Sequence, residues 1–268
     1  MKQVKPEKYD KEYFEHVFQS LDYSKEVELG SFKHIYRTMG DMLKINSRDT
    51  VVDFGCGNGD LSFYLNKKYD CNVMGIDYSK DAVLLCKANL TKYLIKNRTN
   101  SSITFKNINN DQLPKLTNIT AVYFCDVLEH MYDHEIQLVL NQVANWIKDG
   151  HIYLVVHTDN NIYQKVIRPF IDLLSIIAGS ESFVSLRKRN SWEKERHINL
   201  TNPYKLSKKM AKWGYNENVL KFPTASLSVI KKQLGPLGNN KIFVLVIRKV
   251  LRKLSFLSPT FYVIYEKK

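Results

Sequence analysis

The chain has 268 residues, 44% of them hydrophobic and 25% charged, and 40 lysines and arginines against 27 acidic residues give it a net charge of +13. No apolar run reaches the roughly 20 residues of a membrane-spanning helix, and residues 1–6 lack the apolar core of a secretory signal, so we expect neither. The four cysteines include no C-x-x-C pair, which argues against a zinc site and favours free thiols in a reducing cytoplasm.

The first half of the chain alternates short apolar runs with amphipathic ones. Residues 9–14 lead into a helical pattern that continues through Met42. We then expect strands at 50–54, 72–76, 103–107, 121–124 and 151–156, with helices at 60–68, from Ser79 onward and at 135–147. Strands joined by helices in this way predict a parallel sheet with right-handed crossovers, and such sheets bind ligands at the carboxyl ends of their strands.

The pattern changes after His157. A helical apolar patch and a basic polar stretch fill residues 158–196, which is too long for a simple connection and is typical of a functional lid. A helix ending at Gly214 and a final strand at 260–266 follow. Residues 241–254 between them are apolar on one helical face and basic on the other. This pattern indicates either docking on an anionic membrane or a helix that covers the sheet with its basic side in solvent.

A glycine-rich turn follows the first expected strand. Gly55, Gly57 and Gly59 allow positive φ angles and remove every Cβ, so that backbone and ligand can approach closely. An acid, Asp77, comes 20 residues after Gly57 and directly after the second expected strand, where nucleotide-binding folds place the carboxylate that binds ribose. The alternatives are a phosphate-binding loop and an NAD site, although an NAD site favours G-x-G-x-x-G and Leu61 lies two residues after Gly59.

Three segments in this order resemble the class I S-adenosylmethionine-dependent methyltransferases, of the methyltransferase-11/23-like kind that acts on small molecules or glycans. Asp53 to Gly59 is similar to their D-x-G-C-G-x-G motif, Gly75 to Ser79 to their acidic motif, and Asp126 to His130 to their D-V-L-E-H segment. With weaker patterns at both ends, the resemblance extends over roughly residues 9–266.

The resemblance implies an α/β, Rossmann-like fold. Its seven-stranded sheet is mostly parallel with an antiparallel last strand, has helices on both faces, and carries a helical insertion after strand 5. We expect residues 1–45 to form an N-terminal helical cap and 46–158 the S-adenosylmethionine-binding core. Residues 159–196 form the insertion or substrate lid, and 197–268 the C-terminal part with the basic helix.

The resemblance also implies the cofactor, S-adenosylmethionine, and its binding residues, with no metal. The expected cofactor-binding residues are Asp53, Gly55, Cys56, Gly57, Gly59, Asp77, Tyr78, Asn109, Asp126 and Val127. Amides around Gly55 and Gly57 are expected to face the methionine carboxylate, and Asp53 to accept from the ammonium group.

The nucleoside end of the cofactor has its own expected partners. Asp77 offers two acceptors to the ribose hydroxyls. Tyr78 and Val127 are expected to pack on the adenine faces. Asn109 is expected to bond the adenine amine, with Asn110 and Asp111 as neighbouring alternatives.

Three histidines fall in expected active-site loops and are the candidate catalytic bases. His157 follows the fifth strand and has the best position, His130 follows the fourth, and His197 begins a late H-x-N segment. Histidine is suited to deprotonating an alcohol near neutral pH. His130 is alternatively a structural part of its turn, and His157 a loop histidine bonded to backbone.

The acceptor is narrowed by what is missing from the sequence. Neither an N-P-P-Y-like motif nor a Pro-Cys pair is present, which counts against methylation of nucleic-acid bases. We expect methyl transfer to a small or lipid-linked acceptor, such as a hydroxyl of a sugar or surface-glycan precursor, and do not expect a nucleic acid as partner. We expect a cytoplasmic protein with peripheral membrane contact through 241–257. The alternatives are an RNA methyltransferase and a non-catalytic scaffold that binds the cofactor.

Overall fold

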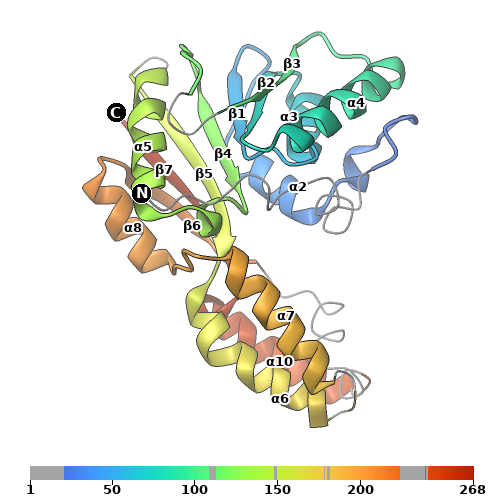
Figure 1. Cartoon of the computed structure of the whole chain (residues 1–268), viewed down its shortest axis with the longest axis vertical. Helices are drawn as coiled ribbons and strands as arrows, with labels where there is room; N and C mark the ends of the chain where they lie inside the picture. Colours follow the sequence, from blue (N-terminus) through green and yellow to red (C-terminus); the bar gives the residue numbers. More distant parts are fainter. Residues whose placement is uncertain are drawn as a thin grey trace.

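A computed structural model describes residues 21–108, 113–147, 150–177, 179, 182–223, 239 and 241–268. Figure 1 shows a twisted sheet with helices on both of its faces and a group of helices that extends below it. The expected segment at 9–14 and the expected adenine contacts Asn109, Asn110 and Asp111 lie outside the described residues.

The seven strands form one sheet in the order β3-β2-β1-β4-β5-β7-β6. They are β1 (Thr50–Phe54), β2 (Asn72–Asp77), β3 (Ile103–Asn107), β4 (Ala121–Cys125), β5 (Ile152–Asp159), β6 (Asn216–Lys221) and β7 (Thr260–Lys267). The first five strands are parallel, and β7 runs antiparallel to both of its neighbours. The predicted Rossmann-like fold, with its antiparallel last strand, is confirmed.

The helices follow the expected order. The longer ones are α2 (His34–Gly40), α3 (Asp60–Tyr69), α4 (Lys80–Lys96), α5 (Asp133–Val143), α6 (Arg168–Ile177), α7 (Phe183–Arg196), α8 (Pro203–Lys212) and α10 (Lys241–Lys253). Short turns are η2 (Leu29–Ser31), η3 (Leu128–His130), η4 (Ala144–Trp146), η5 (Tyr163–Ile167) and η7 (Ser255–Leu257). Ser79 caps α4 as predicted, because its side chain accepts from the amide of Ala82.

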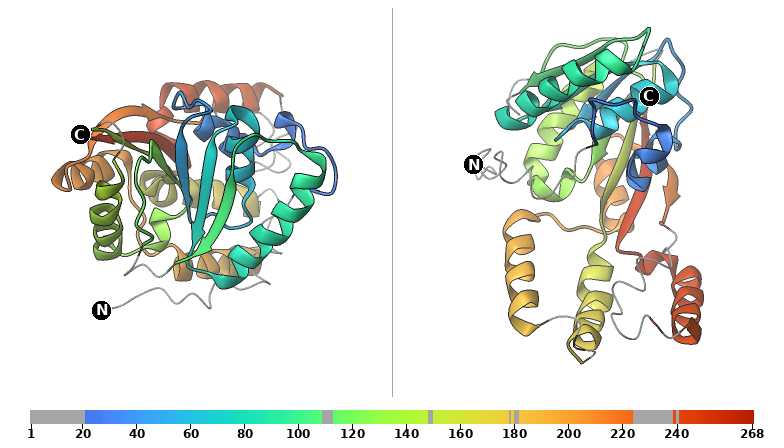
Figure 2. Two further views of the ribbon diagram at one scale, coloured as in Figure 1. Left: turned by 90° about the horizontal axis from the view of Figure 1, so that it is seen from above. Right: turned by 90° about the vertical axis from the view of Figure 1, so that its right-hand side faces the viewer.

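Two hydrophobic cores lie on opposite faces of the sheet. Val51 belongs to the core that includes Phe63 of α3, and Val52 belongs to the core that includes Ile136 of α5. Successive strand residues point to opposite faces, so an apolar strand such as β1 supplies both cores. This arrangement fixes the carboxyl ends of β1, β2, β4 and β5 along one edge of the sheet, seen from two further sides in Figure 2.

Strand β5 is longer than its sequence indicated, which corrects the position of His157. The apolar run predicted a strand at 151–156 with His157 in the loop after it, but β5 continues through Asp159. The reason is a long-range pairing: His157 lies opposite Tyr262, and Asp159 opposite Thr260, along β7. His157 is therefore a strand residue held by hydrogen-bonded neighbours on both sides.

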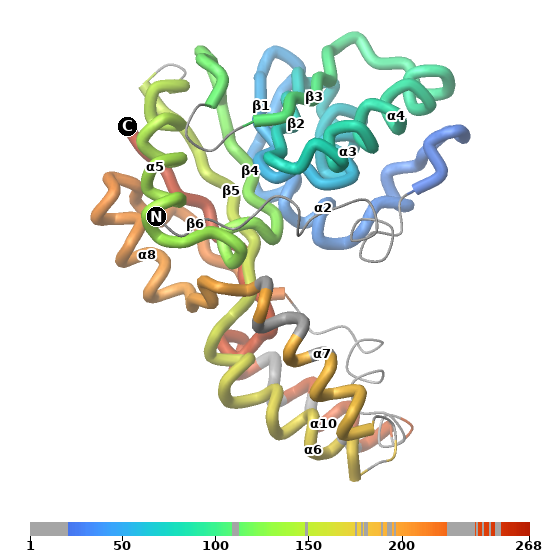
Figure 3. Tube along the Cα trace, in the orientation of Figure 1, coloured from blue at the N-terminus to red at the C-terminus, as the bar shows by residue number. Residues whose placement is uncertain are grey.

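Helices α6, α7 and α10 form a group that we call the helical module. Figures 1 and 3 show the module extending from the end of the sheet at which β5 terminates. Although α10 comes much later in the chain than α6 and α7, it lies with them in the module and not over the sheet (Figure 2). The alternative that the basic helix covers the sheet is therefore wrong.

Candidate functional site

The glycine turn between β1 and α3 is a tight loop that needs glycine. Gly55, Gly57 and Gly59 have φ angles of 71°, 53° and 86°. A Cβ on Gly55 would lie 2.6 Å from a methyl carbon of Val127, and one on Gly59 would lie 2.9 Å from the ring of Phe63. Positive φ and missing Cβ atoms together let the chain turn against the loop after β4.

Asp77 at the end of β2 is tied to the glycine turn. Its two carboxylate oxygens accept from the amides of Gly57 at 3.0 Å and Ser79 at 2.8 Å. Burial raises the pKa of Asp77 to about 6, against the lowering effect of these amides. A carboxylate can accept about four hydrogen bonds, so Asp77 retains capacity for ligand hydroxyl groups.

The amides expected to face the methionine carboxylate have partners inside the protein, which corrects that part of the prediction. The amides of Gly55 and Cys56 both donate to the carbonyl of Ile76, at 2.8 Å and 3.1 Å. The amide of Gly57 is used by Asp77. These three amides therefore hold the turn against the end of β2.

The side chain of Cys56 is directed into the protein core. It is buried, and its sulfur lies 3.8 Å from the sulfur of Cys86 on α4. Its expected role as a cofactor contact therefore cannot rest on the thiol. By contrast, Val127 contacts the turn directly at Gly55, and Tyr78 follows Asp77 at the end of β2.

Asp53, the last residue but one of β1, is a buried carboxyl beside the turn. The hydroxyl of Ser62 donates to it at 2.6 Å. Burial raises the pKa of Asp53 from 3.8 to about 7, with a smaller contribution from the charge of Asp77, although the bond from Ser62 opposes this. Two acids with raised pKa values at one end of the sheet create a site that favours a cationic ligand.

The raised pKa of Asp53 predicts a pH-dependent stability. A carboxyl that binds its proton more tightly in the folded protein stabilises it at low pH, and this contribution is lost as the pH rises from 3.8 to about 7. Between about pH 4 and pH 8, the free energy of unfolding of the wild type should fall by about 4 kcal/mol relative to Asp53→Asn. Urea unfolding of both proteins across this range measures it. Parallel pH profiles would contradict the assignment, and Asp81→Asn on the exposed face of α4 is the control.

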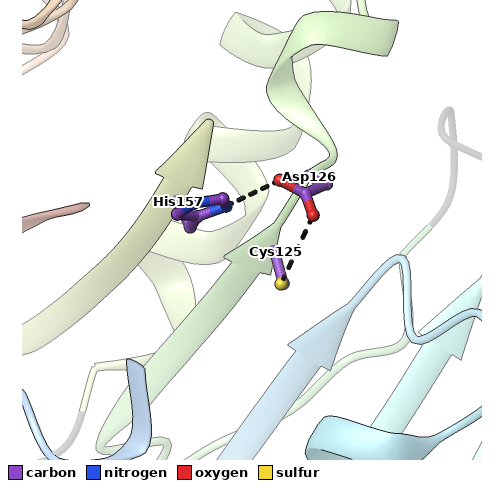
Figure 4. Close-up of side chains that lie close together, drawn as sticks. All are labelled: Cys125, Asp126 and His157. Carbon is purple, nitrogen blue, oxygen red and sulfur yellow. Dashed lines mark hydrogen bonds and ion pairs between the residues drawn. The ribbon is translucent and has the colours of Figure 1, made fainter. Parts of the chain in front are cut away.

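A histidine–aspartate pair lies at the carboxyl ends of β4 and β5 (Figure 4). Nδ1 of His157 on β5 lies 2.6 Å from Oδ1 of Asp126, which follows β4 with a φ of 55°. The ring of His157 also packs on Tyr262 of β7 at 4.5 Å between centroids. His157 is almost fully buried, whereas half of the Asp126 side chain is exposed.

The charge of Asp126 fixes the proton on His157. Desolvation raises the pKa of Asp126, but the positive charge of His157, its hydrogen bond, and the charges of His130 and His197 outweigh this and lower the pKa below 3.8. The carboxylate therefore accepts from Nδ1–H of His157. The neutral ring then carries its lone pair on Nε2, which makes Nε2 the basic atom.

The other two predicted histidines lie at the same edge. Nδ1 of His197 lies 2.9 Å from Oδ2 of Asp159, and the ring of His197 meets the ring of His130 edge-on at 4.8 Å. The fold thus brings His130 and His197 into contact, and both lower the pKa of Asp126 beside His157. The site contains two histidine–carboxylate pairs, of which the sequence predicted the histidines and one carboxylate.

Glu129 and Asp159 are the site residues that the sequence reasoning missed. Glu129 is buried and accepts from the hydroxyl of Thr158 at 2.8 Å. Burial and the charges of Asp126 and Asp159 raise the pKa of Glu129 well above 4.5. A signal for Asp159 was present, because it follows His157 by two residues and strand residues of that spacing share a face.

The N-terminal part of the described chain covers this site. Tyr36 of α2 is buried, and burial together with the charges of Cys125, Asp60, Asp126 and Asp53 raises its pKa well above 10. Its neighbours in the same core include Phe63 and Cys56 of the glycine turn.

Cys125, Asp126 and His157 also offer ligand atoms of three kinds within 4.8 Å of one another, as a metal site requires (Figure 4). The sulfur of Cys125 lies 4.0 Å from Oδ2 of Asp126. The 2.6 Å separation of Nδ1 and Oδ1 is that of a direct, charge-assisted hydrogen bond. We therefore interpret His157 and Asp126 as a proton-transfer pair.

The chain is similar in sequence to known methyltransferases over part of its length. The family profile described as a methyltransferase domain matches residues 51–150. The (S)-tetrahydroprotoberberine N-methyltransferase of Eschscholzia californica is 26% identical over 121 residues, which cover 45% of this chain and 33% of that enzyme. N-methyltransferase 4 of Papaver somniferum is 25% identical over 147 residues, 54% of this chain and 38% of that enzyme. The matches thus span little more than a third of these relatives.

Solved structures share the fold over most of the chain. Geranyl diphosphate C-methyltransferase from Streptomyces coelicolor, in complex with Mg2+, geranyl diphosphate and S-adenosyl-L-homocysteine, has a TM-score of 0.54 at 14% identity, covering 86% of this chain and 75% of that one. A SAM-dependent methyltransferase from Aquifex aeolicus has a TM-score of 0.57 at 10% identity, covering 99% of this chain and 100% of that one.

Proposed function

We propose that this chain, which belongs to the class I S-adenosylmethionine-dependent methyltransferases, transfers the methyl group of S-adenosylmethionine to a hydroxyl group of a small acceptor. The observation that carries the proposal is the joint position of two features at one edge of the sheet. Asp77 at the end of β2 is tied to the glycine turn, and the His157–Asp126 pair lies at the ends of β5 and β4, with β1 between β2 and β4.

The residues at this edge suit the cofactor. Asp77 is the group we assign to the ribose hydroxyls, since its carboxylate has acceptor capacity beyond its two amide bonds. Asp53 is assigned to the ammonium group, because a cation beside this buried acid relieves the cost of ionising it. Val127 and Tyr78, which border the turn, are assigned to the adenine faces.

The histidine pairs supply the base that an alcohol acceptor needs. Nε2 of His157 accepts the hydroxyl proton as the oxygen attacks the methyl carbon, and Asp126 stabilises the imidazolium ion that forms. The sulfonium group supplies the electrophilic methyl when the cofactor is bound. The main tasks of the chain are then to hold the acceptor oxygen in line with that methyl and to exclude water.

We propose a small or lipid-linked acceptor, such as a sugar or surface-glycan precursor, that enters beside the insertion at 159–196. The relatives include enzymes named as N- and C-methyltransferases. The choice of oxygen therefore rests on the histidine–carboxylate pairs, because a base matters most for a nucleophile that must lose a proton.

Transfer of labelled methyl groups into a fractionated cell extract tests the proposal. We expect label in the small-molecule or lipid fraction, as a methyl ether, and loss of that label with His157→Ala. Label confined to RNA would contradict the acceptor class. Tight cofactor binding without transfer to any fraction would instead identify a binding scaffold.

A further inference from the structure

The far end of the helical module exposes large apolar side chains. The end of α6 and the starts of α7 and α10 all lie at the end of the module remote from the sheet, with α7 and α10 on opposite sides of α6 (Figure 2). Ile177, Phe183 and Ile242, which occupy these three helix ends, are 73%, 69% and 76% exposed. Val184 beside Phe183 is similarly exposed. We call this end of the module, made up of the end of α6 and the starts of α7 and α10, the tip. Several large apolar groups exposed to solvent at the tip mark an interaction surface.

The apolar tip continues as an exposed stripe along α10 that changes to lysine. One face of α10 is exposed along its length, and it carries Ile242, Leu245, Val246, Lys249 and Lys253. Val244, on the opposite face, is buried. Lys249 lies about 10 Å along the helix from Ile242, at 1.5 Å per residue. The stripe is thus apolar for roughly the first 10 Å from the tip and basic beyond.

The start of α7 repeats this order, and α6 adds a further exposed apolar stripe. On α7, the apolar pair at the tip is followed by exposed Arg187 and Lys188 one turn further from it. On α6, exposed Phe170, Leu173 and Ile177 share a stripe, with Arg168 on the side nearer the sheet. Asp172, the acidic residue of α6, lies on a different face of the helix.

We propose that the tip of the helical module docks on an anionic lipid bilayer. Interfacial helices bury apolar groups about 5–10 Å into the boundary between headgroups and acyl chains, and this depth matches the apolar part of the α10 stripe. The lysines and arginines one turn above the apolar groups then meet the lipid phosphates. No helix in the described part of the chain has both the length and the apolarity to cross a membrane.

Charge selects a bilayer over the other occupants of such a surface. Residues 241–257 contain five basic and no acidic residues, so two copies meeting through their tips would bring like charges together. The exposed tip groups are mainly aliphatic, which lack the flat faces on which nucleic-acid bases stack. An anionic surface with an apolar interior complements both parts of the tip.

Docking in this way brings the candidate site close to the membrane. The module extends from the edge of the sheet where β5 ends, and this edge holds His157 and Asp126. The inference does not depend on the proposed chemistry. It does specify how a lipid-linked acceptor reaches a site that is itself in water, about one helix length from the surface.

Co-sedimentation of the full chain with vesicles tests the proposal. We expect binding to vesicles of equal parts phosphatidylcholine and phosphatidylglycerol, weak binding to phosphatidylcholine alone, and loss of binding as salt is raised. The double variant Phe183→Asp with Ile242→Asp should bind at least about tenfold more weakly. Its matched control is Leu94→Asp with Ile95→Asp, which changes two similarly exposed apolar residues on α4.

A second pair of variants separates surface position from net charge. Lys249→Glu with Lys253→Glu should weaken binding to anionic vesicles about tenfold or more, whereas Lys87→Glu with Lys92→Glu on α4, with the same charge change, should not. Thermal unfolding and S-adenosylhomocysteine binding check that all variants fold. The proposal would be overturned if the chain bound both vesicle types equally, or if a control pair lost as much vesicle binding as its tip pair. It would also be overturned if the tip variants bound vesicles like the wild type and only broke a dimer or lost bound RNA. Vesicle binding requires no methyl transfer, so its failure is distinct from failure of the proposed function.

Discussion

Replacing Asp77 with alanine is expected to raise the Kd for S-adenosylhomocysteine at least about 100-fold. Two hydrogen bonds from ribose hydroxyls to a carboxylate are lost, each worth about 1.5–3 kcal/mol, and a hundredfold change in Kd corresponds to about 2.7 kcal/mol. The same substitution removes the acceptor for the amides of Gly57 and Ser79, so the turn itself loosens. Titration calorimetry on ligand-free protein measures the change.

Two further variants separate ribose binding from a general loss of structure. Asp77→Asn keeps one acceptor oxygen and should bind with intermediate affinity. Asp81→Ala removes an exposed acid four residues later, at the start of α4, and should bind like the wild type. An Asp77→Ala protein that keeps the wild-type Kd would contradict the assignment of Asp77 to the ribose hydroxyls.

Replacing His157 with alanine should lower kcat about 100- to 10,000-fold while leaving the Kd for the cofactor unchanged. This range is typical for the loss of a general base. We assign the ribose and the ammonium group of the cofactor to Asp77 on β2 and Asp53 on β1, whereas His157 lies on β5, so the two measurements should separate. The rate is measured by methyl transfer into the acceptor fraction that the wild type labels.

The matched control for His157 is His151, which also pairs with a carboxylate and lies where β5 pairs with β7. His151 precedes β5 and lies 2.7 Å from Glu266 of β7, at the opposite end of the sheet. His151→Ala should therefore keep the wild-type kcat. Asp126→Asn should give an intermediate loss, because the ring of His157 loses the acceptor that fixes its proton on Nδ1. A wild-type kcat in His157→Ala would contradict the assignment of His157 as the base. The pair of His197 and Asp159 would then be the next candidate.

The local patterns of the sequence predicted the parts of the fold that depend on neighbouring residues. Alternating glycines, an acid at the end of an apolar run and Ser79 before a helix each determine a local conformation, and β1, β2 and the start of α4 are placed as expected. The extent of β5 was missed because it depends on β7, about a hundred residues later. The prediction followed the apolar run alone and therefore ended this strand at residue 156, before His157.

The site was predictable as a set of residue types and less so as a set of contacts. The position of the three histidines at one edge follows from the parallel sheet. The pairing of His157 with Asp126 and of His197 with Asp159 depends on side-chain geometry that no spacing encodes. The same holds for the amides of Gly55 and Gly57, which the tight closure of the turn on β2 uses internally. The position of the exposed apolar groups at one end of the helical module depends on how α6, α7 and α10 are arranged, which their sequences do not encode.

The central claim is that the glycine turn and Asp77 bind one adenosyl ligand, and calorimetric titration of the ligand-stripped protein tests it most directly. The account predicts that S-adenosylmethionine and S-adenosylhomocysteine bind at one site per chain, and that NADH and ATP produce no comparable heat. Tight binding of NADH or ATP, with no heat from either adenosyl compound, would contradict it.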